Sequence, residues 1–376
     1  MGRIRSAPKL DSILEDIRGR IVTGEYSPGC RLPVRSELEG TYDVSWATLQ
    51  KAFDLLREDG FIETRGRHGT FVAGHPPHLC EYALVFPYRP GEADSWSRYY
   101  ATLRQQAMES PQNEGRRIST YYTGHGDTSS RDCRELLHDV NRHRLAGIIL
   151  SGMAGQTGMQ KLLPDWLPKV AISSMPILGA PAVDPDMFTF WDRSLEYVRS
   201  RGLRRIATFS FLQVPGNWER VQQSMQRHGM ETRPYWNLSF EGSQSPASAA
   251  HLLSRLPKED RPEAMIISDD NLVESTMTGL VAGGIKTPEE LELVIHCNFP
   301  NPPPRILPAA RIGFDCRVVL RTCCDILEKQ RQGEAVPART ALGAVTEKEL
   351  SGSAREEAPV ESQEPMQSQG RWMATV

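Results

Sequence analysis

The chain has 376 residues, 39% of them hydrophobic, which is enough to bury two or three cores. A formal net charge of −3 argues against a generally basic nucleic-acid coat protein, although one local basic patch remains compatible with it. Seven cysteines without a CxxC pair match neither a disulfide framework nor a zinc site. With no apolar signal segment and no transmembrane stretch, we expect a cytoplasmic protein without membrane contacts, metal or cofactor.

The first part of the chain has a helical pattern that ends in two short strands. An apolar stripe at three- and four-residue spacings predicts a first helix that ends near Gly24; its members are Leu10, Ile13, Leu14, Ile17 and Ile21. A second helix follows Pro33, and a third runs to about Asp59 after Ser45, whose hydroxyl is expected to cap it. The segment FIETRGRHGTFVA then predicts two strands around a glycine-rich, basic tip.

Six short motifs follow one another in register between Ile13 and Ala73. They are a Gly-x-x-x-Pro-Gly lead, Leu-Pro, Glu-Leu, Val-Ser-x-x-Thr, a long helix ending in Gly, and the wing Gly-Thr-Phe-Val. This order resembles the winged helix-turn-helix of the GntR family, which implies a recognition helix in the major groove and a wing near the backbone or minor groove. The predicted DNA contacts are Arg35, Ser36, Ser45, Trp46, Thr48, Gln50, Lys51, Arg65, Arg67, His68 and Gly69.

Three departures from the family pattern bear on which operator is read. Ser36 and Trp46 stand where the family usually has arginine, and Gln50 with Lys51 replaces its usual basic pair. Residues 1–76 carry eleven Lys or Arg and eleven Asp or Glu, so affinity should depend on a few placed contacts and on dimerisation. Two alternatives remain open: the segment is a plain helical bundle, and Trp46 packs against the second helix instead of touching DNA.

A proline-containing hinge separates this module from a larger α/β region. We expect a winged helix-turn-helix at 1–76, a hinge at 77–80, a ligand-binding domain at 81–345 and a disordered tail at 346–376. Apolar strand runs alternate with helical stretches, which predicts parallel sheets built from βαβ units. The expected strands are Tyr82 to Phe86, Ile118 to Tyr122, Gly147 to Ser151, Lys169 to Ser173, Arg205 to Phe211, Ala264 to Ser268 and Leu291 to His296.

Several motifs of the larger region occur in the order found in one family of sensors. They are RLAGIIL, Val183-Asp184, RSRGLRRIATFSF, PGNWERVQQSMQRHG, PEAMIISDDNLVES and GGIKTPEELELVIHCNF. The region resembles the ligand-sensing domain of the LacI family, which is similar to periplasmic sugar-binding proteins and has two lobes. The resemblance implies that Arg220 and Asp270 bind ligand and that His296, Cys297 and Asn298 end a pocket-lining strand.

A binding site is also expected on physical grounds, because ligands lie beyond the carboxyl ends of strands in open α/β sheets. Arg89, Asp127, Asp270 and Asn298 follow predicted strands, while Trp191 and Trp218 could supply a stacking face. A guanidinium facing a carboxylate, here Arg220 facing Asp270, can hold neighbouring hydroxyls of a sugar or polyol. The alternative for each residue is a surface ion pair or a core aromatic.

These features predict a transcriptional regulator without enzymatic activity. We expect a homodimer that binds a pseudo-palindromic operator and whose binding is modulated by a sugar or related polyol or acid. Family analogy favours a repressor, while the sign of the ligand effect stays open. The alternatives are an enzyme with a regulatory DNA-binding module, for which no catalytic motif is found, and a solute-binding protein without a transcriptional role.

Overall fold

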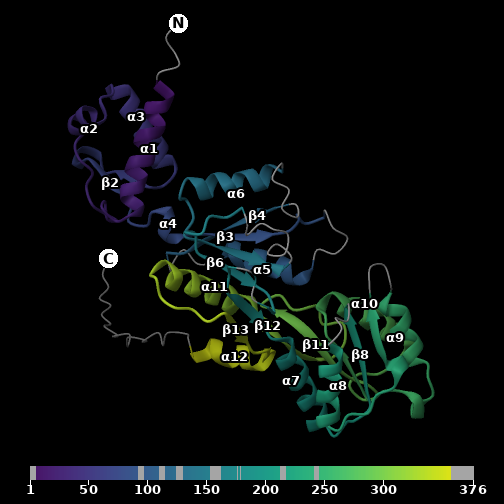
Figure 1. The fold of residues 1–376 in the computed structure, drawn as a ribbon. Coiled ribbons are helices and arrows are strands. Elements are labelled where there is room, and N and C mark those ends of the chain that lie inside the picture. The colour runs from purple at the N-terminus through teal and green to yellow at the C-terminus, as the bar shows by residue number, and fades with distance from the viewer. Residues whose placement is uncertain are drawn as a thin grey trace, which may run out of the picture.

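The structure is a computed structural model that describes residues 6–356, except 92–96, 110–114, 124–129, 153–161, 176, 178, 212–216 and 241–244. Figure 1 shows a small, mainly helical domain at the N-terminal end beside a larger two-lobed α/β body. The fold class expected from the sequence is confirmed. None of the helices in the described ranges is both long and apolar enough to cross a membrane.

Three helices and a two-stranded hairpin form the small domain. Its elements are α1 (Ser6–Val22), α2 (Arg35–Tyr42), α3 (Trp46–Glu58), β1 (Ile62–Thr64) and β2 (Thr70–Val72). The predicted apolar stripe of α1 is buried against α3, with Ile13 and Ile17 packed in one core with Leu49 and Phe61. Burying these side chains contributes most of the driving force that holds the three helices together.

The first lobe is a parallel six-stranded sheet in the order β13-β7-β6-β5-β3-β4. Its strands are β3 (Glu81–Phe86), β4 (Arg117–Tyr122), β5 (Gly147–Ser151), β6 (Lys169–Ile172), β7 (Ala182–Pro185) and β13 (Arg339–Leu342). The short helix α4 (Pro77–Cys80) leads into it, and its helices are α5 (Arg98–Glu109), α6 (Arg131–Asn141) and α11 (Cys316–Arg331). Side chains of α11 complete the core on one sheet face, where Leu320 and Leu327 pack with Leu84.

The second lobe has a six-stranded sheet in the order β14-β12-β11-β10-β8-β9, parallel except for the short edge strand β14. Its strands are β8 (Ile206–Phe211), β9 (Asn237–Phe240), β10 (Ala264–Ile267), β11 (Glu292–Phe299), β12 (Ala310–Asp315) and β14 (Val345–Thr346). Its helices are α7 (Met187–Ser200), α8 (Asn217–Arg227), α9 (Pro246–Ser254) and α10 (Asp270–Gly283). Separate apolar cores cover its two faces, as a two-faced parallel sheet requires.

The chain passes between the lobes at three places. It leaves the first sheet after β7, returns through α11 after β12, and leaves again between β13 and β14. The carboxyl ends of the central strands therefore meet the boundary between the lobes, which is where ligands bind in folds of this kind.

The start of the expected disordered tail is instead a helix, α12 (Glu347–Glu356). Thr346 and Glu349 form a capping box: the Thr346 amide donates to Glu349 Oε2 at 2.7 Å, and the Glu349 amide donates to Thr346 Oγ1 at 3.2 Å. Arg193 holds the same glutamate at 2.6 Å, and Arg305 holds Glu347 at 2.6 Å. These local contacts outweigh the polar composition, so the prediction of disorder is wrong for this segment; residues 357–376 lie outside the described part.

Candidate functional site

The N-terminal turn of α3 carries two adjacent hydroxyl groups. Ser45 occupies the cap position in extended conformation, and its carbonyl accepts hydrogen bonds from the amides of Thr48 and Leu49 at 3.0 and 3.1 Å. The expected side-chain cap is not formed, because the Ser45 hydroxyl turns to the Thr48 hydroxyl 3.2 Å away. Both hydroxyls therefore stay at the outer surface of the turn, where they can meet a phosphate or a base edge.

Trp46 lies on the surface rather than in the space between α2 and α3. It is 59% exposed, and its one described partner is the Arg35 guanidinium, 5.9 Å from the ring centroid. Arg35 also lies over Phe53 and donates a hydrogen bond to Gln50, which in turn donates to Asp54 at 2.8 Å. The packing alternative for Trp46 is thus not what the structure shows, and an aromatic face is left open to solvent.

The remaining predicted residues of the small domain lie on α2, α3 and the wing. Ser36 on α2 and Lys51 on α3 are exposed, and Thr48 and Gln50 are half-buried. The wing carries Arg65, which pairs with Glu63 at 2.6 Å and lies over the Phe71 ring, and the exposed side chains Arg67 and His68.

Gly69 has a structural requirement in the wing. Its φ of 106° is unfavourable for residues with a side chain, and an added Cβ would lie 2.9 Å from Arg31 Nε. Arg31, which the sequence reasoning missed, is exposed and bridges to Phe71 of β2. Its position in the Gly-Cys-Arg-Leu-Pro segment, just ahead of the Leu-Pro motif, was the available signal. Hydroxyls, an indole and cations are thus present at the surface of α2, α3 and the wing, and they are of the types that base and phosphate contacts use.

Asp270 and Asn298 are brought together at the carboxyl ends of β10 and β11. The Asp270 carboxylate is 2% exposed and accepts a hydrogen bond from Asn298 Nδ2 at 2.7 Å. Burial raises the pKa of Asp270 to about 7, and the neighbouring Asp269 adds to the shift. Both residues were predicted, and the pair presents an acceptor and a donor side by side.

The described contact of Arg220 is with an aromatic ring and not with this pair. It is exposed on α8, where its guanidinium carbon lies 3.6 Å from the Phe188 ring centroid, an interaction that holds it over an aromatic surface. The arginine whose charge acts on Asp270 is Arg98, at the start of α5 in the first lobe. Its amide donates to Asn271 Oδ1 at 3.0 Å, so the two lobes touch here. No sequence signal pointed to Arg98, because its contact spans 173 residues.

The other predicted ligand residues have different surroundings. Trp191 is 6% exposed and packs edge-on against Phe190, and half-buried Trp218 packs on the same core, so Trp191 is a core aromatic and not a stacking face. Arg89 pairs with Asp132 and lies over the Tyr122 ring at 5.6 Å. Asp127 lies outside the described residues.

His296 is buried on β11, two residues before Asn298. Neither of its ring nitrogens is hydrogen-bonded in the described part of the chain. Its ring is enclosed by Phe190 and Phe314, with centroids 5.2 and 5.7 Å away, and burial lowers its pKa to about 4. The neutral imidazole therefore keeps its donor and acceptor available.

Comparison with known proteins identifies the kind of protein. Residues 9–72 match the gntR family of bacterial regulatory proteins. Over 322 residues the chain is 20% identical to the arabinose metabolism transcriptional repressor of Geobacillus stearothermophilus, covering 78% of this chain and 83% of that one. The chain is a transcriptional regulator with a GntR-type DNA-binding domain.

The larger part of the regulator has a LacI-like fold. A regulatory protein of the LacI family from Chloroflexus aggregans matches with a TM-score of 0.57 at 17% identity, covering 71% of the regulator and 96% of that chain. A LacI family transcriptional regulator from Lactobacillus casei, solved with bound sucrose, matches with a TM-score of 0.51 at 18% identity, covering 71% and 97%. The predicted combination of a GntR-type head with a LacI-like body is confirmed.

Proposed function

We propose that the regulator is a homodimeric repressor that reads a pseudo-palindromic operator with α3 and the wing, and that a carbohydrate modulates this binding. The observation that carries the proposal is the outer face at the start of a GntR-type recognition helix, where Trp46 and Lys51 are exposed and Thr48 is half-buried. A helix presenting its N-terminal outer face in this way fits the major groove. The proposed role is binding and not catalysis.

The DNA contacts divide into reading and positioning groups. Trp46 offers an apolar face to a thymine methyl group, and Gln50 offers an amide, although its hydrogen bonds with Arg35 and Asp54 restrain it. Lys51 and the wing residues Arg67 and His68 fit phosphate contacts. A single domain with so few cations binds weakly, so two domains on two half-sites supply the affinity.

For the effector, we propose a site around Asp270 and Asn298 with the buried imidazole of His296 nearby. A carboxylate and an amide side by side hold neighbouring hydroxyls, the pattern that a sugar presents. The relatives named for arabinose metabolism and solved with bound sucrose favour the same ligand class. Further proposed contacts, made in the ligand-bound arrangement of the two lobes, are Arg220, Trp218, Arg89 and Asp127.

The DNA proposal is tested by operator affinity. Thr48→Ala and Lys51→Ala should each weaken binding by on the order of 1 kcal/mol, and Lys51→Ala should also reduce the salt dependence. Lys258→Ala, on the second lobe, is the matched control and should bind normally. Fluorescence anisotropy with a DNA fragment selected by the wild-type protein measures all three. Wild-type affinity in both head variants would remove the assignment of α3 as the recognition helix.

The effector proposal is tested by calorimetry with L-arabinose, other sugars, sugar acids and polyols. Asp270→Ala should lose on the order of a hundredfold in affinity for whichever compound binds, because a charged hydrogen bond is lost. Its DNA affinity without ligand should stay near wild type. Asp260→Ala, which breaks a surface pair with Arg233, serves as the control. Normal ligand binding by Asp270→Ala would show that the site lies elsewhere.

A further inference from the structure

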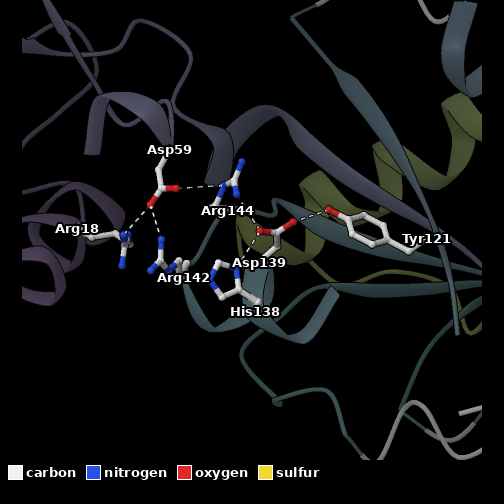
Figure 2. A network of polar contacts seen from close by, with 7 residues as sticks. All are labelled: Arg18, Asp59, Tyr121, His138, Asp139, Arg142 and Arg144. Carbon is white, nitrogen blue, oxygen red and sulfur yellow. Dashed lines mark hydrogen bonds and ion pairs between the residues drawn. The ribbon is translucent and has the colours of Figure 1, made fainter. Parts of the chain in front are cut away.

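The DNA-binding domain meets the first lobe at a buried carboxylate. Asp59, the C-cap residue that follows α3, is 8% exposed. Its Oδ2 accepts a hydrogen bond from Arg18 Nη2 of α1 at 2.9 Å. Two arginines that follow α6 in the first lobe approach the same carboxylate: Arg142 Nη1 at 3.5 Å and Arg144 Nε at 3.8 Å (Figure 2). We call Arg18, Asp59, Arg142 and Arg144 the Asp59 joint.

A ring contact accompanies the ion pairs. Phe61, just after α3, stacks on His78 of α4 with centroids 5.9 Å apart and planes 8° apart, and the Arg18 guanidinium lies 5.3 Å from the Phe61 centroid. The carbonyl of Leu79 of α4 accepts a hydrogen bond from Arg331 of the first lobe at 3.2 Å. The short connection between the domains thus contacts both the small domain and the first lobe, which favours a defined orientation over a free tether.

One member of the joint is shared with a second carboxylate. Arg144 Nη1 donates to Asp139 Oδ1 at 2.9 Å while its Nε lies 3.8 Å from Asp59. Asp139 is itself fixed by the Tyr121 hydroxyl, which donates to Oδ2 at 2.7 Å, and by His138 Nδ1 at 3.5 Å (Figure 2). Arg144 is thus hydrogen-bonded to Asp139 and makes only a longer contact with Asp59, so a small movement of its guanidinium can loosen the hold on Asp59 while the bond to Asp139 is kept.

The charge balance favours this loosening. Three guanidinium groups surround one Asp59 carboxylate, and burial together with the charges of Arg142 and Arg144 lowers the pKa of Arg18. Because like charges are held close together here, a movement of Arg144 away from Asp59 relieves repulsion at the same time as it weakens the hold on Asp59. The free-energy cost of loosening the joint is therefore small.

The other end of this chain of contacts lies at the edge of the first sheet. Tyr121 is the second-last residue of β4, and its neighbour Tyr122 stacks on Phe86 at 5.9 Å and lies beneath Arg89. These side chains stand at the carboxyl ends of β3 and β4, on the side of the sheet where a ligand would bind. A displacement of the strand end is therefore passed to Asp139 through one hydrogen bond.

We propose that the Asp59 joint couples the sensor to the DNA-binding domain by fixing or releasing the orientation of α3. The reading end of this 13-residue helix, with Trp46 and Thr48, is opposite to Asp59, so docking leaves it open to DNA. The joint positions the recognition helix and does not cover it. This coupling rests on the proposed ligand response, whereas the docking itself does not.

The docking is tested without ligand or DNA, by hydrogen exchange of the full chain. The double variant Arg142→Gln, Arg144→Gln leaves the pair of Arg18 with Asp59 intact, and the control Arg131→Gln removes an arginine of α6 that is 82% exposed and paired locally with Glu135. Amides of residues 57–62 and 76–81 should exchange about tenfold faster in the double variant and at the wild-type rate in the control. Equal rates in all three proteins would overturn the docking.

If the double variant does not fold, the wild type supplies the same answer. About 0.5 M NaCl should accelerate exchange in these two segments and leave the sheet cores unchanged, because partly exposed ion pairs are screened by salt. Exchange that does not respond to salt would contradict the joint.

The coupling is tested by operator anisotropy with and without L-arabinose and the other probe sugars. The double variant should bind sugar with the affinity of the wild type. The change in DNA affinity that the sugar causes should be at least tenfold smaller in the double variant than in the wild type. A response equal to that of the wild type would overturn the coupling. A wild type that binds DNA but answers to no sugar would instead refute the proposed effector class, while the exchange result would still decide the docking.

Discussion

Removing the carboxylate of Asp59 should destabilise the DNA-binding domain more than any exposed charge change in it. Asp59→Ala leaves the Arg18 guanidinium, 6% exposed, without its ion-pair partner. Breaking one side of a buried pair costs about 3–5 kcal/mol. At about 0.05–0.15 kcal/mol per residue, a domain of the size of residues 9–72 has a total stability of only about 3–10 kcal/mol. The substitution therefore removes much of it.

Differential scanning calorimetry of the full chain measures this effect. A transition belonging to the DNA-binding domain should separate and move down by more than about 12 °C, since each kcal/mol shifts the Tm of so small a domain by about 4–8 °C. Asp59→Asn, which still accepts a hydrogen bond, should lie between this variant and the wild type. Glu25→Ala, which breaks the exposed pair with Arg20, should cost at most about 1 kcal/mol. Equal Tm values for Asp59→Ala and Glu25→Ala would refute the reasoning.

Two further predictions concern the larger body. Because the pKa of Asp270 is raised to about 7, the folded chain keeps this proton to a higher pH than the unfolded chain, so the contribution of Asp270 to stability falls as pH rises from about 4 to about 7. The lowered pKa of His296 has the opposite effect on stability, so the contribution of Asp270 is isolated by comparing urea unfolding of the wild type with that of Asp270→Asn. The unfolding free energy of the wild type minus that of the variant should fall by up to about 1.4 kcal/mol per pH unit. A difference independent of pH would contradict the prediction. Truncation after residue 356 should leave the Tm unchanged, whereas truncation after 346 should lower it because the contacts of Glu347 and Glu349 are lost; equal Tm values would argue against a structural role for α12.

Periodic apolar residues allowed much of the fold to be predicted from sequence. The stripe of α1 and the runs that became β3, β5 and β10 were found within a few residues of their observed bounds. Among the strands not predicted as such, β9 (Asn237–Phe240) and β13 (Arg339–Leu342) are short edge strands, whereas β12 (Ala310–Asp315) is a largely buried strand inside its sheet. Their backbone pairing depends on a neighbouring strand that is distant in sequence, and composition alone does not reveal it.

A site residue could be predicted from the sequence only where its residue type and its position were enough to decide its chemical role. Asp270 and Asn298 end neighbouring parallel strands, so topology brought them together as expected. Whether Trp191 faces a pocket or a core depends on the rotation of α7, which the apolar residues around it did not settle. The Asp59 joint was not predicted, because charged residues on helices usually face solvent and its partners are 41 to 85 positions apart.

The three crossings between the lobes bear on the order in which the nascent chain can fold. The first lobe cannot close its core until α11 has been synthesised, because Leu320 and Leu327 fill one face of its sheet. The strands β8 to β12 of the second lobe are complete by Asp315, so we expect this lobe to resist proteolysis before the first lobe does in ribosome-bound chains of increasing length. The DNA-binding domain, complete by residue 72, would then wait for the surface that carries Arg142. The DNA-binding domain can therefore align with the sensor only near the end of synthesis. A chain whose synthesis is interrupted would release a DNA-binding domain with nothing to orient it.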